Sequence, residues 1–127
     1  MKASDEGVTV VSEMVFPNQT NHYGTLFGGE ALKLMSKAAF IAASRAARKD
    51  VVMASVDRTT FHEPLRQGDL AEVLARVVQS GNSSLTVVTE MFSENLRTGE
   101  RRLCSDATFI MVAVDHEGRP ISRAQEP

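Results

Sequence analysis

Apolar and polar side chains alternate along most of this chain, and a period of two is typical of β-strands with one buried face. In residues 51–61, the alternation predicts that Val52, Ala54 and Val56 share one face of a strand. Strands are predicted on this basis at residues 8–16, 51–61, 70–79, 84–93 and 103–114. Residues 70–79 also suit a helix by propensity, but the turns on either side and the shared parity of their apolar residues favour a strand.

One segment breaks this alternation. Residues 28–48 begin with Gly28 and Gly29 and continue without glycine or proline, with many Ala, Leu and Met residues, which predicts one long helix. Glu30 lies in the first turn and Arg45 in the last, as the helix dipole favours. We expect a curved sheet to pack closely around this helix because its side chains are small.

The predicted order is one strand, the helix and then four strands joined by short turns, which indicates an α+β domain with an antiparallel sheet. At 127 residues the chain suits a single domain, residues 1–127. An antiparallel sheet of this kind has unpaired edge strands, and a second copy of the chain can satisfy such an edge. A homodimer is therefore expected.

Composition excludes several classes of function. A net charge of -2 provides no basic field for nucleic acid. Cys104 is the single cysteine, so no internal disulfide can form, and no Cys/His pair has metal-ligand spacing. The N-terminus lacks an apolar signal segment, and the longest uncharged stretch of the helix, residues 38–44, is too short to cross a bilayer. We expect a soluble, cytoplasmic, metal-free protein.

A polar loop with glycines leads into the helix, with the sequence NHYGTLFGG at residues 21–29. The first amides of a helix have no partner within it, so a helix start marked by glycines can present free N–H groups to a ligand. The alternative is that Gly28 and Gly29 only permit a tight turn from the loop into the helix.

This loop and several shorter motifs resemble the hot-dog fold acyl-CoA thioesterases, in particular the short bacterial acyl-CoA hydrolases. The other motifs are Val56-Asp57-Arg58 with Phe61 and Pro64, Gly68-Asp69, Gly81-Asn82-Ser83-Ser84, Ala107-Thr108-Phe109 and Val114-Asp115. The resemblance implies a sheet wrapped around one central helix, dimers joined at their sheet edges that often assemble into trimers of dimers, and active sites shared between protomers. The implied reaction, which belongs to fatty acid metabolism, is hydrolysis of acyl-CoA to coenzyme A and a free acid, without a metal or redox cofactor.

The resemblance also implies roles for single residues. Gly28 and Gly29 would donate their amides to the thioester oxygen as it becomes an oxyanion, and loss of one such donor typically costs about 10²- to 10³-fold in rate. Asn21 would lie near the attacking water, although an Asx-turn is the commoner use of such an asparagine. Ser36 occupies the helix position at which active relatives generally carry the carboxylate that serves as general base or nucleophile.

An unaided serine hydroxyl cannot accept a proton from water near neutral pH, and general-base assistance is typically worth about 10²- to 10⁴-fold. Another carboxylate could replace it, and the candidates are Glu30, Asp57 and Glu63, from this protomer or its partner. Alternatively, Ser36 and Asn21 hold a water between them in a slow enzyme, or the site binds acyl-CoA without hydrolysing it. Ser36 could also be only a small residue in a tightly packed helix.

The phosphates of coenzyme A require cationic, amide or hydroxyl partners. Arg66 and the turn residues Asn82, Ser83 and Ser84 are the candidates. Three other functions stay open at this stage: a non-catalytic acyl-CoA binding protein, a hot-dog hydratase or dehydratase, and a structural oligomerisation module. The first of these is the main rival because Ser36 argues against any chemistry that needs a carboxylate.

Overall fold

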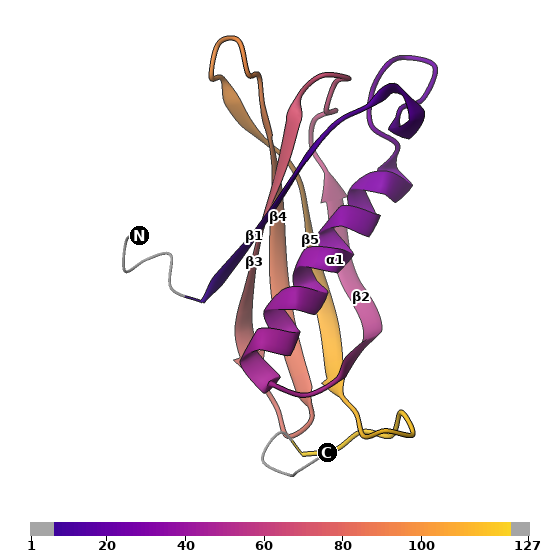
Figure 1. Cartoon of the computed structure of the whole chain (residues 1–127), viewed down its shortest axis with the longest axis vertical. Helices are drawn as coiled ribbons and strands as arrows, with labels where there is room; N and C mark the ends of the chain where they lie inside the picture. The colour runs from indigo at the N-terminus through magenta and orange to yellow at the C-terminus, as the bar shows by residue number, and fades with distance from the viewer. Residues whose placement is uncertain (1–6, 123–127) are drawn as a thin grey trace.

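The computed structural model describes residues 7–122 as one long helix packed on a five-stranded sheet (Figure 1). The elements in chain order are β1 (Val8–Met14), the 3-10 helix η2 (Pro17–Gln19), α1 (Gly28–Ala47), β2 (Val51–Phe61), β3 (Leu70–Ser80), β4 (Ser84–Glu94) and β5 (Arg101–Ala113). The strands are antiparallel and lie in the order β1-β3-β4-β5-β2. The predicted α+β architecture is confirmed, including the assignment of residues 70–79 to a strand.

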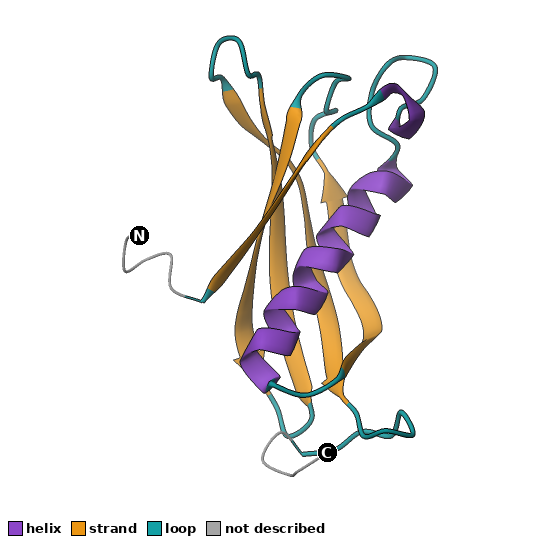
Figure 2. Ribbon diagram, viewed as in Figure 1, coloured by secondary structure: helices purple, strands orange, loops and turns teal. Residues whose placement is uncertain are grey.

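The helix lies along one face of the sheet, which curves around it (Figure 2). Its buried stripe consists mostly of small residues: Ala31, Leu34, Met35, Ala38, Ala39, Ala42, Ala43 and Ala47. These small side chains allow the helix to approach the larger buried residues of the sheet, among which Phe109 is fully buried. No helix in the described part of the chain, residues 7–122, is long and apolar enough to cross a membrane.

The strand β2 departs from the simple alternation that its sequence suggests. Its pairing with β5 shifts register between Met53 and Ser55 and again between Val56 and Arg58. Because each extra residue reverses the face on which the following side chains lie, Val56 lies on the face of Met53 and not on that of Val52. The predicted common face of Val52, Ala54 and Val56 is therefore wrong, and the bulges are the reason.

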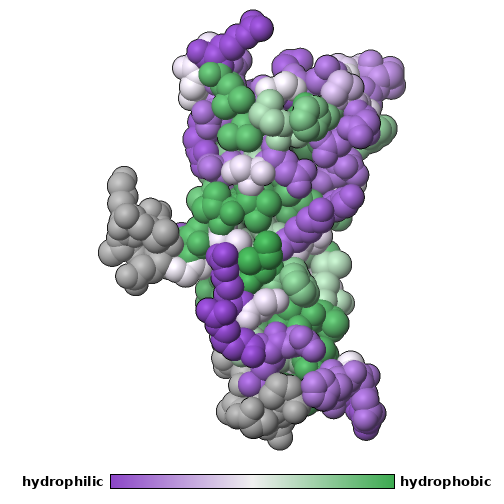
Figure 3. Space-filling model, viewed as in Figure 1, coloured by the Kyte–Doolittle hydropathy of each residue, from purple (hydrophilic) through white to green (hydrophobic). Residues whose placement is uncertain are grey.

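The helix covers β3 and β4 more fully than β2, which forms one edge of the sheet. Apolar side chains on the helix-facing side of β2 are consequently exposed: Met53 is 50%, Val56 37% and Phe61 55% accessible. Phe40 on α1 is 49% accessible. Figure 3 shows apolar surface gathered in the middle of the helix-bearing face, with polar side chains towards both ends. The seam between α1 and β2 is thus open and apolar.

Candidate functional site

The loop before α1 is closed by hydrogen bonds of its own backbone. Asn21 N–H donates to the Thr25 carbonyl at 2.9 Å, and Gly24 N–H donates to the Asn21 carbonyl at 3.0 Å. Gly24 has a φ of 79°, a conformation that glycine adopts readily. A backbone bridge between Thr25 and Arg66 fastens this loop to the one that precedes β3. The loop is therefore a fixed support beside the start of the helix.

The side chain of Asn21 is held in one orientation. Its Oδ1 accepts hydrogen bonds from Tyr23 N–H at 3.0 Å, from Thr25 N–H at 3.2 Å and from the Thr25 hydroxyl at 3.2 Å. Two of these partners can only donate, so the atom that receives them must be the amide oxygen. Asn21 thus forms the turn that its position suggested, and the same contacts leave its Nδ2 group as a donor.

The N-terminus of α1 has no side-chain cap because the preceding residue is Phe27. Ala31 N–H donates to the Phe27 carbonyl at 3.0 Å, which is the first bond of the helix. Within residues 7–122, no protein acceptor receives the amides of Gly28 and Gly29. These two N–H groups carry the positive end of the helix dipole and are available to a ligand oxygen.

Neither glycine is required by the fold around it. Gly28 and Gly29 both lack a positive φ. A Cβ on Gly29 would meet nothing within 4 Å, and one on Gly28 would lie 3.5 Å from the Phe61 ring, an ordinary contact distance. The alternative explanation, a tight turn that only glycine permits, therefore has no support in the backbone. The space that a side chain would take is open at Gly29 and borders the Phe61 ring at Gly28.

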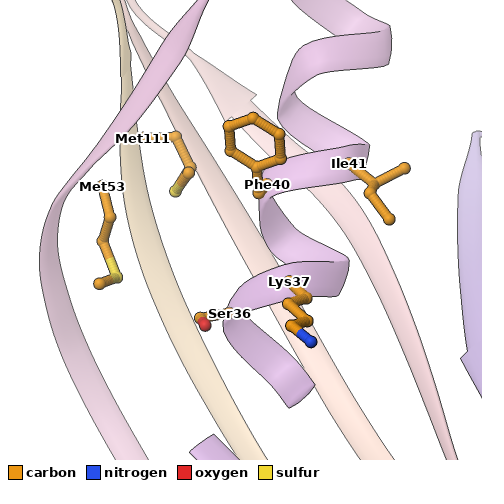
Figure 4. Close-up of a pocket in the computed structure, with 6 residues that line it drawn as sticks. All are labelled: Ser36, Lys37, Phe40, Ile41, Met53 and Met111. Carbon is orange, nitrogen blue, oxygen red and sulfur yellow. The ribbon is translucent and has the colours of Figure 1, made fainter. Parts of the chain in front are cut away.

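A groove of about 370 Å³ lies in the seam between α1 and β2 (Figure 4). It is lined by Ser36, Lys37, Phe40 and Ile41 from α1, Met53 from β2 and Met111 from β5. The Ser36 hydroxyl donates to the Lys33 carbonyl at 2.8 Å, so the helix backbone already satisfies it. Apart from Lys37, the other lining side chains are apolar, which suits an alkyl chain better than a charged group.

None of the three carboxylates considered as substitutes lines this groove. Glu30 lies with Lys33, Leu34 and Lys37 along a hollow that faces β1. Asp57 accepts a hydrogen bond from the Ser55 hydroxyl at 3.2 Å on the edge strand, and Glu63 forms an ion pair with Arg102 at 3.1 Å. Within one protomer, none of the three therefore lies beside Ser36 in the groove, and a substitute carboxylate would have to act from another direction or from a second copy of the chain.

The proposed coenzyme A contacts do not come together in one protomer. Arg66 pairs with Thr25 beside the start of α1. The turn that contains Asn82, Ser83 and Ser84 follows β3 at its far end. The eleven residues of β3 separate the two places by about 35 Å at roughly 3.3 Å per residue. A site that uses both must draw them from two copies of the chain.

The structure adds three residues that sequence reasoning did not place at the site. Thr25 fixes Asn21, Phe61 lies against Gly28, and Met53 lines the same groove as Ser36. The position of Thr25, four residues after the asparagine, was a usable signal for a hydrogen-bonded turn. No local pattern could reveal Phe61 or Met53, because their places depend on the register of β2 against β5.

Helix amides without a protein acceptor, an oriented asparagine amide and a largely apolar groove all lie on or next to α1. Comparison with known proteins identifies the family. Residues 23–100 match the family model described as the Thioesterase superfamily, and the chain belongs to that family. The resemblance predicted from the sequence, and the hot-dog fold with it, are confirmed.

Three relatives illustrate the likeness. The uncharacterized acyl-CoA thioester hydrolase YkhA of Bacillus subtilis is 36% identical over 116 residues, which cover 91% of this chain and 67% of YkhA. The acyl-CoA hydrolase of Staphylococcus aureus, solved with butyryl coenzyme A and coenzyme A, superposes with a TM-score of 0.87 at 32% identity, over 93% of this chain and 72% of that one. The hexameric thioesterase y2039 of Yersinia pestis has a TM-score of 0.84 at 32% identity, over 90% and 93%.

The Staphylococcus aureus hydrolase has also been solved as three alanine variants, which replace an asparagine, an aspartate and a threonine. By the residue numbers of that enzyme, the aspartate follows the asparagine by 15 positions and the threonine follows it by 32.

Proposed function

We propose that this protein hydrolyses acyl-CoA thioesters to coenzyme A and a free carboxylic acid. The observation that carries the proposal is the start of α1, where the unpaired amides of Gly28 and Gly29 lie on a helix that also lines an apolar groove. The names of relatives such as YkhA support the same reaction. In this proposal the thioester carbonyl meets the helix amides, and the acyl chain follows the seam between α1 and β2.

The chemistry requires negative charge on the carbonyl oxygen to be stabilised while water attacks the carbonyl carbon. Two helix amides and the Nδ2 group of Asn21 are suitable donors to that oxygen or to the water. When the tetrahedral intermediate collapses, the carbon–sulfur bond breaks, and the sulfur of coenzyme A receives a proton. Each of these steps can occur without a metal or redox cofactor.

The described residues that line the groove include no carboxylate that could act as a general base. In the Staphylococcus aureus hydrolase, the substituted aspartate and threonine lie 15 and 32 positions after the substituted asparagine. Counted from Asn21, the same spacings reach Ser36 and Met53, which both line the groove. We therefore expect hydrolysis to be slow, by about 10²- to 10⁴-fold for a missing base. The same two residues favour the second candidate function, binding of acyl-CoA without turnover.

Oligomerisation is part of the proposal, supported by hexameric relatives. The exposed edge strand β2 is available to pair with β2 of a second copy. Antiparallel pairing across a two-fold axis would bring the partner's turn that follows β3 to the end of the dimer where this protomer's Asn21 loop lies. Asn82, Ser83 and Ser84 of one copy and Arg66 of the other could then contact one coenzyme A.

A thiol-release assay with acyl-CoA substrates of graded chain length tests the function. We expect slow release of coenzyme A that depends on the acyl chain and rises in proportion to protein concentration. Tight binding of acyl-CoA by calorimetry, with no release above the background rate, would identify a binding protein instead. Hydration of an enoyl-CoA in the same preparation would identify a hydratase.

The Thr25 hydroxyl is expected to act as a positioning group through its bond to Asn21 Oδ1. A Thr25→Val variant should lower kcat by about 3- to 10-fold, the value of one hydrogen bond, with little change in KM. Thr25→Ser should restore the rate, and Thr20→Val, which removes a hydroxyl bonded only to the nearby Pro17 carbonyl, should leave it unchanged. If Thr20→Val and Thr25→Val lowered kcat equally, the effect would be a general loosening of the loop.

A further inference from the structure

Met53 on β2 and Ser36 on α1 line the same groove. Figure 4 shows Ser36 on the helix and Met53 on the strand β2. The register shift directly after Met53 is what permits Met53 and Val56 to occupy the helix-facing side together. Met53 also pairs with Met111 of β5, so two thioethers form the floor beside Ser36.

This groove offers very few polar groups to a side chain at position 36. Of the residues that line it, Phe40, Ile41, Met53 and Met111 have no hydrogen-bond donor that can serve a carboxylate. Lys37 carries the one charge among them, but adjacent residues of a helix diverge by about 100° and do not face each other. The Ser36 hydroxyl is satisfied because it turns back to the Lys33 carbonyl.

A carboxylate placed at position 36 would have only the flexible ammonium groups of Lys33 and Lys37 on its own helix as charged donors, and no donor on the opposite wall of the groove. In an apolar setting the charged form is disfavoured, so the carboxyl pKa rises and a misoriented or protonated acid is a poor base. A hydroxyl on the opposite wall would donate to the carboxylate and reverse both effects, and hydrogen bonds to charged groups are worth about 10- to 100-fold. A methionine at position 53 cannot supply this bond.

The converse holds when position 36 is a serine bonded to its own helix. A hydroxyl at position 53 would then find no side-chain partner among the residues that line the groove, while a thioether packs well there. At the spacings of the substituted aspartate and threonine of the Staphylococcus aureus hydrolase, this chain has Ser36 and Met53. By this argument the residue that suits one position depends on the residue at the other.

Resting on the proposed function, we propose that Met53 and Ser36 together set the hydrolytic rate. The residue at position 53 decides whether a carboxylate at position 36 is held ionised and aligned. Met53 is in this sense a positioning residue, because it acts through position 36. The present pair, Ser36 with Met53, gives a groove suited to holding an acyl chain and poorly suited to activating water.

Four proteins and one control test the coupling: the parent, Ser36→Asp, Met53→Thr, the double variant, and Ser36→Asp combined with Met53→Val. Valine has the shape of threonine without the hydroxyl, so it separates hydrogen bonding from the change in volume. We expect Met53→Thr alone to lower thiol release by about 2- to 5-fold, because it removes apolar surface from the groove, and Ser36→Asp alone to raise it by less than about 10-fold. The double variant should raise it by about 10²- to 10⁴-fold, while the valine control should match Ser36→Asp alone.

Titration of the introduced carboxyl by carbon NMR in the same variants gives a readout that does not depend on turnover. The pKa should be lower beside Thr than beside Val because only the hydroxyl stabilises the ionised form. Equal pKa values, or a double variant whose rate equals the product of the single effects, would overturn the proposal. A lowered pKa without thiol release in any variant would support the coupling and overturn the hydrolase function instead.

Discussion

A Gly29→Ala variant is expected to lose about 10²- to 10³-fold in thiol release while remaining as stable as the parent. The added methyl group meets nothing within 4 Å, so the fold accepts it without strain. Alanine in a helix is also more favourable than glycine by about 0.5–1 kcal/mol, so thermal stability should be unchanged or slightly higher. The rate should fall because the methyl group stands in the space through which a thioester oxygen reaches the first amides of α1.

The assay should follow thiol release in the parent and in the Ser36→Asp, Met53→Thr background, with melting temperature measured on the same samples. Lys33→Ala is the matched control, because Lys33 is an exposed residue of the same helix that does not line the groove. A Gly29→Ala protein with the full rate would show that the thioester oxygen does not reach the helix amides through the space beside Gly29. A variant that loses both stability and rate would contradict the expectation that a methyl group at position 29 meets no neighbouring atom.

A Phe109→Ala variant is expected to lose about 3–5 kcal/mol of unfolding free energy. Phe109 is fully buried on β5, opposite Val87 of β4 and Val56 of β2, beneath the Ala-rich face of α1. Small helix residues cannot extend to fill the cavity that the ring leaves, so little relaxation is possible. Because domains are stable by only about 5–15 kcal/mol in total, much of the folded state should be lost.

Urea unfolding at one fixed protein concentration measures this effect, since assembly makes the midpoint depend on concentration. The neighbouring Ile110→Ala variant is the control, because Ile110 is only half-buried on the opposite face of the sheet. We expect a clearly smaller shift of the midpoint for the control, with an unchanged slope. Equal shifts would mean that the two faces of the sheet are buried to a similar degree, for example by a partner covering the outer face.

The part of the candidate site that lies within one continuous segment could be located from the sequence. Asn21, Gly28 and Gly29 lie within nine consecutive residues, so the loop and the helix start could be located from the sequence. The positions of the three candidate carboxylates relative to Ser36 could not be read from the sequence. In the structure, Glu30 faces β1, Asp57 lies on the edge strand, and Glu63 is paired with Arg102. The direction of each side chain depends on helix phase and strand register, which no short motif reports.

The sequence by itself determined the elements of this protein, because the period of apolar residues and the turn residues between them are local properties. It determined one Ala-rich helix, the strands on either side of it, and a glycine-marked helix start. Only the tertiary structure decided that β2 carries two bulges, that Met53 and Ser36 line one groove, and that the turn at Asn82 lies far from Arg66. These facts depend on strand pairing between residues distant in the chain, where one extra residue reverses a whole face.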